Sequence, residues 1–400
     1  MKKQMRHIAH IILIFTFLLS ENAAKAQPSQ KNYEVEARAH FGYLYFQSDE
    51  YHSALGRYSS HVPALELSLH RNTYGQHRWE VLHNYPSIGL TFYHSPLTFR
   101  NTNVTNELGN VFALYPYINF PFNKSASSQL TFKFGVGVSY LTKKFHPTEN
   151  YHNYAIGSHL NAAVNLSFEY RQRLFDRLTL VTSAGLTHFS NGATKAPNMG
   201  INIFSAATGF SWYLKPPKSL IDRRLRPVPY PFEFDGRRHF VTDVQYTVGY
   251  KDVSQQYSAN DFYLIHNLAA QAMLQLTERD RLGMGAELVF DNSDRVTHPE
   301  WNHIAKLGVL LSYEMMLDQV SFMFNIGIRN NEPIPAKAFL FYQKAGLRYY
   351  VWNNLFATLC FTTYDIKADF ISIGLGYHFQ HKYYLPRHEK KPHRTPVYPR

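Results

Sequence analysis

Apolar side chains alternate with small or polar ones along most of the chain, and this alternation constrains the fold more than any other feature. In residues 177–190 the even positions from Leu178 to Leu186 are mostly apolar, whereas the odd positions are mostly threonine, serine or glycine. A β-strand points successive side chains to opposite faces, so such a segment forms a strand with one apolar face. We predict sixteen strands of this kind, at 32–46, 61–73, 86–98, 110–122, 128–142, 157–173, 177–190, 200–214, 237–251, 261–277, 281–291, 302–316, 319–329, 338–351, 354–364 and 368–380.

Residues 1–26 have the features of a secretory signal peptide and are left out of the predicted fold. A basic start, an apolar run from Ile11 to Leu19 and the small-residue site Ala24-Lys25-Ala26 predict cleavage before Gln27. No later segment approaches the roughly 18 uninterrupted apolar residues that a transmembrane helix needs. Cys360 is the sole cysteine, which excludes an intramolecular disulfide and a thiolate metal site.

An exported chain that is rich in aromatic residues and has no helical span is typical of an outer-membrane β-barrel. Aromatic residues make up 16% of the chain and charged residues 18%. The spacers between the predicted strands alternate between long and short, as outer loops and periplasmic turns do in such barrels. The barrel must close, because lipid offers no partner to an open strand edge. The predicted fold class is all-β, a transmembrane antiparallel β-barrel of the bacterial outer membrane with roughly 16 strands.

An interruption of the alternating pattern divides the predicted strands into two sets of eight. Residues 215–238 contain five prolines, which exclude a strand because proline donates no ladder hydrogen bond. We interpret 27–215 as the half that carries the chemistry, 216–236 as a periplasmic connection, 237–380 as a second half of about eight further strands, and 381–400 as a basic periplasmic tail. One barrel of roughly sixteen strands is the preferred arrangement, and a junction between two barrels is the alternative.

Three features lie outside the regular pattern. The segment 71–85 is long for the side that carries short turns, and nothing in the sequence explains it. The last strand ends in the aromatic Phe379 and resembles the C-terminal signal read by the outer-membrane assembly machinery, although a tail follows it. The net charge of +12 includes the signal peptide and this tail, so we interpret it as solvated and lipid-facing charge rather than a nucleic-acid surface.

The sequence His188-Phe189-Ser190 lies where an alternating strand meets a turn, and Asn202 follows twelve residues after the serine. His188 and Ser190 continue the apolar face of their strand, and Asn202 begins the apolar face of the next one. The three side chains are therefore predicted to meet on the lipid-facing surface, at the level of the outer leaflet. A serine needs a base to take its proton, and the base needs a third group to orient it. We predict Ser190 as the nucleophile, His188 as the base and Asn202 as the orienting residue.

This stretch resembles the active-site hairpins of two families of outer-membrane hydrolases. His188 to Asn191, with Lys195-Ala196-Pro197-Asn198-Met199-Gly200, is similar to the hairpin of lipid A 3-O-deacylases, also called acyloxyacyl hydrolases. That resemblance implies an eight-stranded barrel over roughly residues 30–215, with a lipid-facing triad that acts on lipid A of lipopolysaccharide in the outer leaflet. The departure is Asn202, because that family has an acidic residue there. Outer-membrane phospholipase A, a twelve-stranded barrel, has an asparagine at this spacing.

The loop and the strand layout favour the deacylase over the phospholipase. We predict an outer-membrane serine esterase, a carboxylic ester hydrolase that removes an ester-linked acyl chain from lipid A. The alternatives are an outer-membrane phospholipase A and a non-catalytic pore or scaffold barrel that uses the second half. The resemblance covers less than half of the chain and gives residues 235–380 no counterpart.

Other polar residues near the predicted site have weaker assignments. Asn191 and Asn198 are predicted either to donate to the oxyanion or to support the turn, and both roles stay open. No cofactor is predicted and no metal ligand is assigned, while a calcium site of the phospholipase kind is left open without ligands. Basic residues of the predicted outer loops are interpreted as solvated side chains that can meet lipid A phosphates: Arg57, Arg100, Lys143, Lys144 and Lys195.

Overall fold

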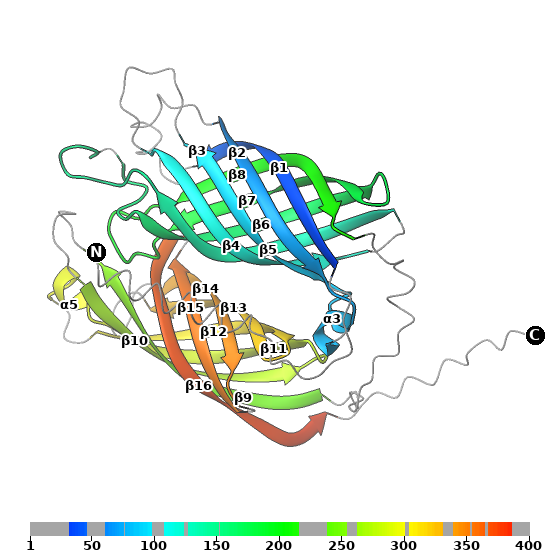
Figure 1. Ribbon diagram of the computed structural model, residues 1–400. Coiled ribbons are helices and arrows are strands. Elements are labelled where there is room, and N and C mark those ends of the chain that lie inside the picture. Colours follow the sequence, from blue (N-terminus) through cyan, green and yellow to red (C-terminus); the bar gives the residue numbers. More distant parts are fainter. Residues whose placement is uncertain are drawn as a thin grey trace, which may run out of the picture. The chain divides into compact units, whose positions relative to one another are not determined.

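The computed structural model describes residues 32–45, 61–75, 77–97, 108–123, 127–151, 153–215, 238–253, 262–300, 304–330, 339–352, 354–364 and 367–385. These residues form two closed antiparallel barrels of eight strands each (Figure 1). The first barrel consists of β1 (Asn32–Tyr45), β2 (His61–Asn72), β3 (Ser87–Pro96), β4 (Asn110–Pro121), β5 (Ser128–Leu141), β6 (Leu160–Arg173), β7 (Leu178–Ser190) and β8 (Ile201–Tyr213). The second consists of β9 (Arg238–Asp252), β10 (Phe262–Gln275), β11 (Asp280–Asp291), β12 (Ala305–Leu317), β13 (Val320–Asn330), β14 (Phe339–Tyr350), β15 (Leu355–Tyr364) and β16 (Lys367–Leu385).

The all-β fold class and the sixteen predicted strands are confirmed, but the preferred single barrel was wrong. β8 turns back to pair with β1, in a register that places Asn202 opposite Tyr45. β16 pairs with β9 in the same way, with Ile371 opposite Tyr250. Each half therefore satisfies its own edge strands, and neither needs the other to close.

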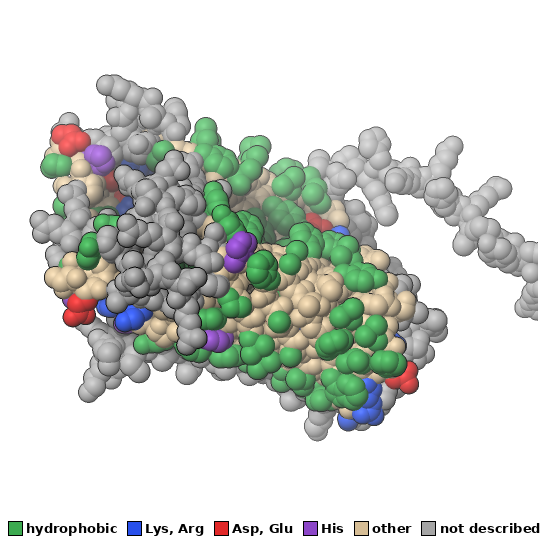
Figure 2. Space-filling model, turned by 90° about the horizontal axis from the view of Figure 1, so that it is seen from above, with side chains coloured by type: hydrophobic (Ala, Val, Ile, Leu, Met, Phe, Trp, Pro, Cys, Tyr) green, Lys and Arg blue, Asp and Glu red, His purple; other side chains and the backbone are tan. Residues whose placement is uncertain are grey.

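The outer faces of the barrels are apolar, as a lipid-facing surface requires. On β8 the even positions Phe204, Phe210 and Trp212 are about half exposed, whereas the odd positions Ile201 and Ile203 are buried. Figure 2 shows one face of the molecule, on which apolar side chains spread across the surface. Large apolar side chains that stay exposed on the other strands of the first barrel include Phe41, Leu67, Phe92, Leu114 and Phe168.

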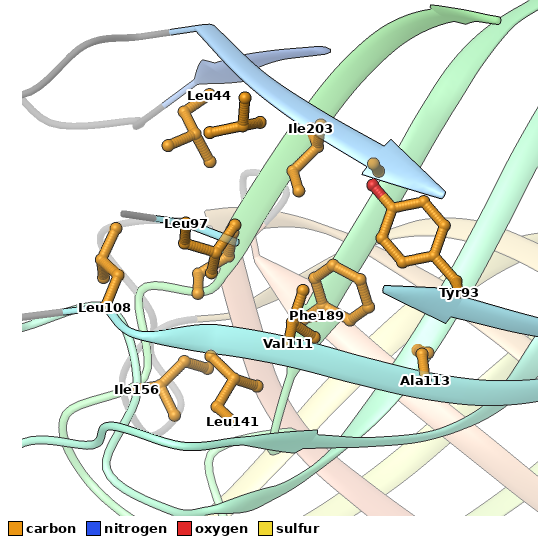
Figure 3. Packing of buried hydrophobic residues seen from close by; sticks show 14 of the residues in the cluster. Leu44, Tyr93, Leu97, Leu108, Val111, Ala113, Leu141, Ile156, Phe189 and Ile203 are labelled. Carbon is orange, nitrogen blue, oxygen red and sulfur yellow. The ribbon is translucent and has the colours of Figure 1, made fainter. Parts of the chain in front are cut away.

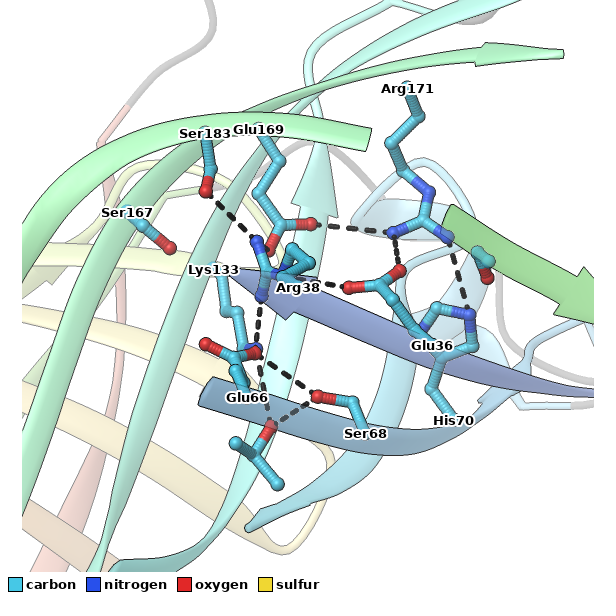
Figure 4. Close-up of polar contacts among 12 residues, drawn as sticks. Glu36, Arg38, Glu66, Ser68, His70, Lys133, Ser167, Glu169, Arg171 and Ser183 are labelled. Atoms are coloured by element: carbon cyan, nitrogen blue, oxygen red, sulfur yellow. Dashed lines mark hydrogen bonds and ion pairs between the residues drawn. The ribbon is translucent and has the colours of Figure 1, made fainter. Parts of the chain in front are cut away.

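The interior of the first barrel is filled by buried ion pairs (Figure 4). Arg38 on β1 lies 3.0 Å from a carboxylate oxygen of Glu36 and 2.8 Å from one of Glu169, and it also pairs with Glu66. Glu66 pairs in addition with Lys133 from β5. Buried charges are tolerated only when they are paired and hydrogen-bonded, and an eight-stranded barrel is narrow enough for side chains to meet across it. The described interior is therefore a packed core and not an aqueous channel.

One end of the first barrel is closed by an apolar cluster (Figure 3). We call this the site end, because it carries the connection 191–200 between β7 and β8. Phe189 from β7 packs here against Tyr93 of β3, with ring centroids 6.0 Å apart. The other buried members are Leu44, Val62, Ala64, Leu97, Leu108, Val111, Ala113, Tyr115, Leu141, Ala155, Ile156, Ala163, Ile201 and Ile203. The cluster fixes the inward faces of β7 and β8 where the predicted site lies.

The second barrel is also filled by buried ion pairs. Arg348 on β14 lies 2.7 Å from a carboxylate oxygen of Asp243 and 3.4 Å from one of Glu314. Glu287 pairs with Lys344 and lies 3.5 Å from Arg329. All six side chains are buried, so the second interior is packed like the first.

The segment 71–85, which the sequence left unexplained, contains the short helix α3 (Arg78–Leu82). Arg78 forms an ion pair with Glu278, and the His83 imidazole Nε2 lies 2.8 Å from the carbonyl oxygen of Met316. Glu278 and Met316 belong to the second barrel half, so the length of this connection allows contact between the halves. A second short helix, α5 (Asp294–Thr297), lies between β11 and β12. Within the described part of the chain, no helix is long and apolar enough to cross a membrane.

Several predicted features fall outside the described residues. They are the signal peptide 1–26, the connection 216–236, the tail from residue 386, and the loop residues Arg57 and Arg100. The last strand differs from the prediction, because β16 continues to Leu385 and pairs there with Arg238. The described chain therefore stays in the sheet for five residues of the predicted tail.

Candidate active site

His188 and Asn202 face each other across the hairpin of β7 and β8. Their neighbours Phe189, Ile201 and Ile203 point into the apolar cluster and are fully buried. Because side chains alternate along a strand, His188 and Asn202 point outward, and both are partly exposed. The alternation that forms the two strands therefore also places this pair on the outer face.

A hydrogen bond of 2.7 Å joins His188 Nδ1 to the side-chain oxygen of Asn202. A carbonyl oxygen can only accept, so the imidazole donates from Nδ1. In the neutral ring the lone pair then lies on Nε2, which is free to accept a proton. Asn202 thus sets the tautomer that a general base requires.

Ser190 lies two residues beyond His188 on the same strand face, and its side chain is only 2% exposed. Among the described residues its hydroxyl has no hydrogen-bond partner, and the structure records no bond between it and His188. In free enzymes such bonds are often long and tighten only when substrate is bound. The Ser190 hydroxyl is therefore buried, and within the described ranges no other group is hydrogen-bonded to it.

The two asparagines of the connection 191–200 have different roles. Asn191 is buried and braces the connection: its side-chain NH₂ donates to Ser158 Oγ at 3.0 Å and to the carbonyl oxygen of Lys195 at 2.8 Å. Asn198 accepts the backbone N–H of Asn191 at 2.9 Å through its side-chain oxygen. The Asn198 side-chain nitrogen is buried and has no partner in the described structure. Within the described structure, the Asn198 side chain therefore has an unused amide donor, whereas the NH₂ group of Asn191 makes two hydrogen bonds.

Gly200 ends this connection next to the imidazole. Its φ is +78°, and a Cβ there would lie 2.9 Å from His188 Cε1. Only glycine adopts this conformation readily and leaves room for the ring. The Gly200 backbone therefore lies close to the Cε1 edge of the His188 ring.

The structure changes the interpretation of one predicted basic residue. Lys195 lies 3.1 Å from a carboxylate oxygen of Asp252, so its charge is already partnered inside the protein. Sequence reasoning did not identify Asp252 or Ser158 as neighbours of the site, because neither lies near it in sequence. Across the described ranges, no three His, Cys, Asp or Glu side chains are grouped so that they could hold a metal ion.

Two closed barrels with apolar outer faces and packed polar interiors define a transmembrane β-barrel protein. The family described as lipid A 3-O-deacylase (PagL) matches residues 64–211, which include His188 and Ser190. The family described as acyloxyacyl hydrolase, C-terminal domain, matches residues 240–382. The chain therefore belongs to the lipid A 3-O-deacylase, or acyloxyacyl hydrolase, family. The second match also gives the second barrel the counterpart that the sequence resemblance lacked.

Solved structures resemble the chain only in general form. Neisserial surface protein A has a TM-score of 0.30 and 8% identity, over 45% of this chain and 96% of its own. The Acinetobacter baumannii protein OccAB3 has a TM-score of 0.24 and 10% identity, over 88% of this chain and 100% of its own. Likeness at this level does not bear on function. No protein of curated function matches the chain.

Proposed function

We propose that the chain is a serine esterase of the bacterial outer membrane that removes an ester-linked acyl chain from lipid A. The substrate class comes from the family that matches residues 64–211. The observation that supports the mechanism is the 2.7 Å bond between His188 and Asn202, on the same outward face as Ser190. The outward face is the side from which a membrane lipid can approach.

In the proposed reaction Ser190 Oγ attacks the ester carbonyl carbon while His188 Nε2 takes the hydroxyl proton. Asn202 holds the imidazole and stays bonded to Nδ1–H as the ring becomes positive. The imidazolium then gives its proton to the departing alkoxide oxygen of the sugar, which leaves the acyl group on Ser190. Water attacks this acyl-enzyme with His188 again as base, and the fatty acid is released.

Asn198 supplies a donor for the negative oxygen of the tetrahedral intermediate. Its buried side-chain nitrogen has no partner in the described structure, which is the state expected of a preorganised donor before substrate binds. The proposed mechanism uses only protein side chains, the ester and water, and no step calls for a cofactor. Its substrate is lipid A in the outer leaflet.

Purified protein in detergent tests the proposal directly. Ser190→Ala and His188→Ala are each expected to abolish fatty-acid release from lipid A while the barrels stay folded, as judged by their heat-dependent gel migration. Full activity of the Ser190→Ala protein would refute the mechanism.

Mass spectrometry of lipids from expressing cells separates the alternatives. Lipid A that has lost one acyl chain supports the proposal, whereas the appearance of lysophospholipid favours a phospholipase. The observation that favours this alternative is the asparagine at position 202. An unchanged lipidome favours a non-catalytic barrel. Packed ion pairs in both described interiors already argue against an open pore.

A further inference from the structure

Asp252, the last residue of β9 in the second barrel, contacts the connection 191–200 of the first barrel at three points. Its backbone N–H donates to the carbonyl oxygen of Ala193 at 2.8 Å. Its carboxylate accepts the backbone N–H of Ala196 at 3.4 Å and lies 3.1 Å from Lys195 Nζ. The carboxylate is fully buried, so these contacts stabilise a charge that water does not reach.

A residue of the neighbouring strand of the second barrel contacts the beginning of the same connection. Gly192 has a φ of +62°, and a Cβ there would lie 2.4 Å from the Ile371 side chain on β16. Ile371 is paired in the sheet with Tyr250 on β9, two residues before Asp252. Two paired strands of the second barrel therefore contact residues 192–196 through both backbone and side chains.

This connection begins next to Ser190 and carries the other polar groups of the site. Asn198 is tied to Asn191 within it, and its last residue, Gly200, packs against the His188 ring. A shift of residues 192–196 would therefore move the Asn198 donor relative to Ser190. The position of the donor in the first barrel depends on contacts made by the second.

We propose that the second barrel serves as a scaffold for the active-site connection and that Asp252 is a positioning residue for the oxyanion donor. The inference rests on the proposed esterase function. It gives the second half of the chain a role in the reaction without placing any of its residues in contact with substrate. Because the donor acts on charge that develops in the transition state, its misplacement lowers kcat and leaves KM nearly unchanged.

The test compares Asp252→Ala with Asp252→Asn in the full-length protein. Asp252→Ala removes the acceptor for Ala196 and the partner of Lys195, and we expect kcat to fall about 10- to 100-fold with KM kept. Asp252→Asn keeps an acceptor oxygen of the same shape and is expected to retain most of the activity. Glu287→Gln is the matched control, because Glu287 pairs with Lys344 inside the second barrel and not with the connection. We expect Glu287→Gln to lower stability and leave kcat unchanged.

Amide hydrogen exchange of residues 191–200 gives a readout that does not depend on activity. Exchange is expected to rise in Asp252→Ala and to stay low in Glu287→Gln. Unchanged exchange in Asp252→Ala would overturn the scaffold role, and raised exchange with unchanged kcat would overturn the positioning role. If Ser190→Ala keeps full activity, the esterase proposal fails, and the exchange data still decide whether Asp252 holds the connection.

Discussion

Replacement of Asn202 by alanine tests whether the third residue orients the imidazole. The change removes the acceptor of a 2.7 Å bond and leaves the partly buried Nδ1–H of His188 without a partner. Loss of a partner for a buried donor costs about 1–3 kcal/mol, and about 1.4 kcal/mol corresponds to a tenfold change in rate. We therefore expect kcat to fall roughly 5- to 150-fold, a milder loss than removal of Ser190 because the nucleophile and the base remain.

Initial rates of fatty-acid release in detergent micelles measure this effect. Asn202→Asp and Asn202→Glu keep an acceptor for Nδ1–H and are expected to retain measurable activity. Asn165→Ala is the matched control: Asn165 donates to Thr187 Oγ at 3.0 Å inside the barrel, on the opposite face of the same sheet. Its loss should affect stability and not kcat.

Two results would contradict this reasoning. If Asn202→Ala is as active as the unmodified protein, Asn202 only begins a strand and does not orient His188. If Asn165→Ala loses as much activity, the effect of Asn202→Ala reflects general loosening of the sheet.

Two further predictions follow from the site and from the helix α3. Asn198→Ala should lower kcat about 10²- to 10³-fold with little change in KM, because it removes an oxyanion donor. Single-turnover and steady-state kinetics measure both constants, and a raised KM with unchanged kcat would exclude that role. Burial lowers the pKa of His83 from its usual range, so the fold favours the neutral imidazole and loses stability as the pH falls below about 6.5. His83→Gln should therefore show a smaller loss of thermal stability between pH 7 and pH 5, and identical pH profiles would refute this assignment.

Strand positions were predictable because lipid outside and polar groups inside impose a period of two on each strand. β7 was predicted at 177–190 and runs from Leu178 to Ser190. β16 was predicted to end at 380, yet it pairs with β9 as far as Leu385 after an irregularity near Gln380. The alternation of apolar and polar residues marks the part of a strand that contacts lipid. It ends where that contact ends, although the backbone hydrogen bonds between the strands continue.

The number of barrels was not predictable from the same pattern, because alternation is local and closure is not. A strand such as β8 has the same face pattern whether its free edge meets β1 or β9. β8 pairs with β1, and the barrel that this pairing closes is narrow enough for oppositely charged interior side chains to meet across it. Arg38 and Glu169 form such an ion pair. Inward charges that pair within each set of eight strands were the available signal.

The same contrast between local pattern and long-range contact decides which site residues could be predicted. The shared face of His188 and Asn202 followed from alternation, and the hairpin register then brought their side chains into contact. The sequence could not distinguish Asn191 from Asn198, because both lie in one turn and either could have the free amide. That distinction depends on Ser158, a partner 33 residues away from Asn191.

The neutral asparagine at position 202 fits the distribution of charge in the first barrel. Ionised side chains such as Arg38 and Glu66 lie in the interior, where each meets a partner, whereas the outward face at the site carries the neutral pair His188 and Asn202. An ionised carboxylate on that face would lose hydration without gaining an interior partner, which is costly next to lipid. An amide avoids that cost, but it stabilises the imidazolium less than a carboxylate would. The Asn202→Asp protein therefore sets two opposing effects against each other, and its rate relative to the unmodified protein measures which of them is larger.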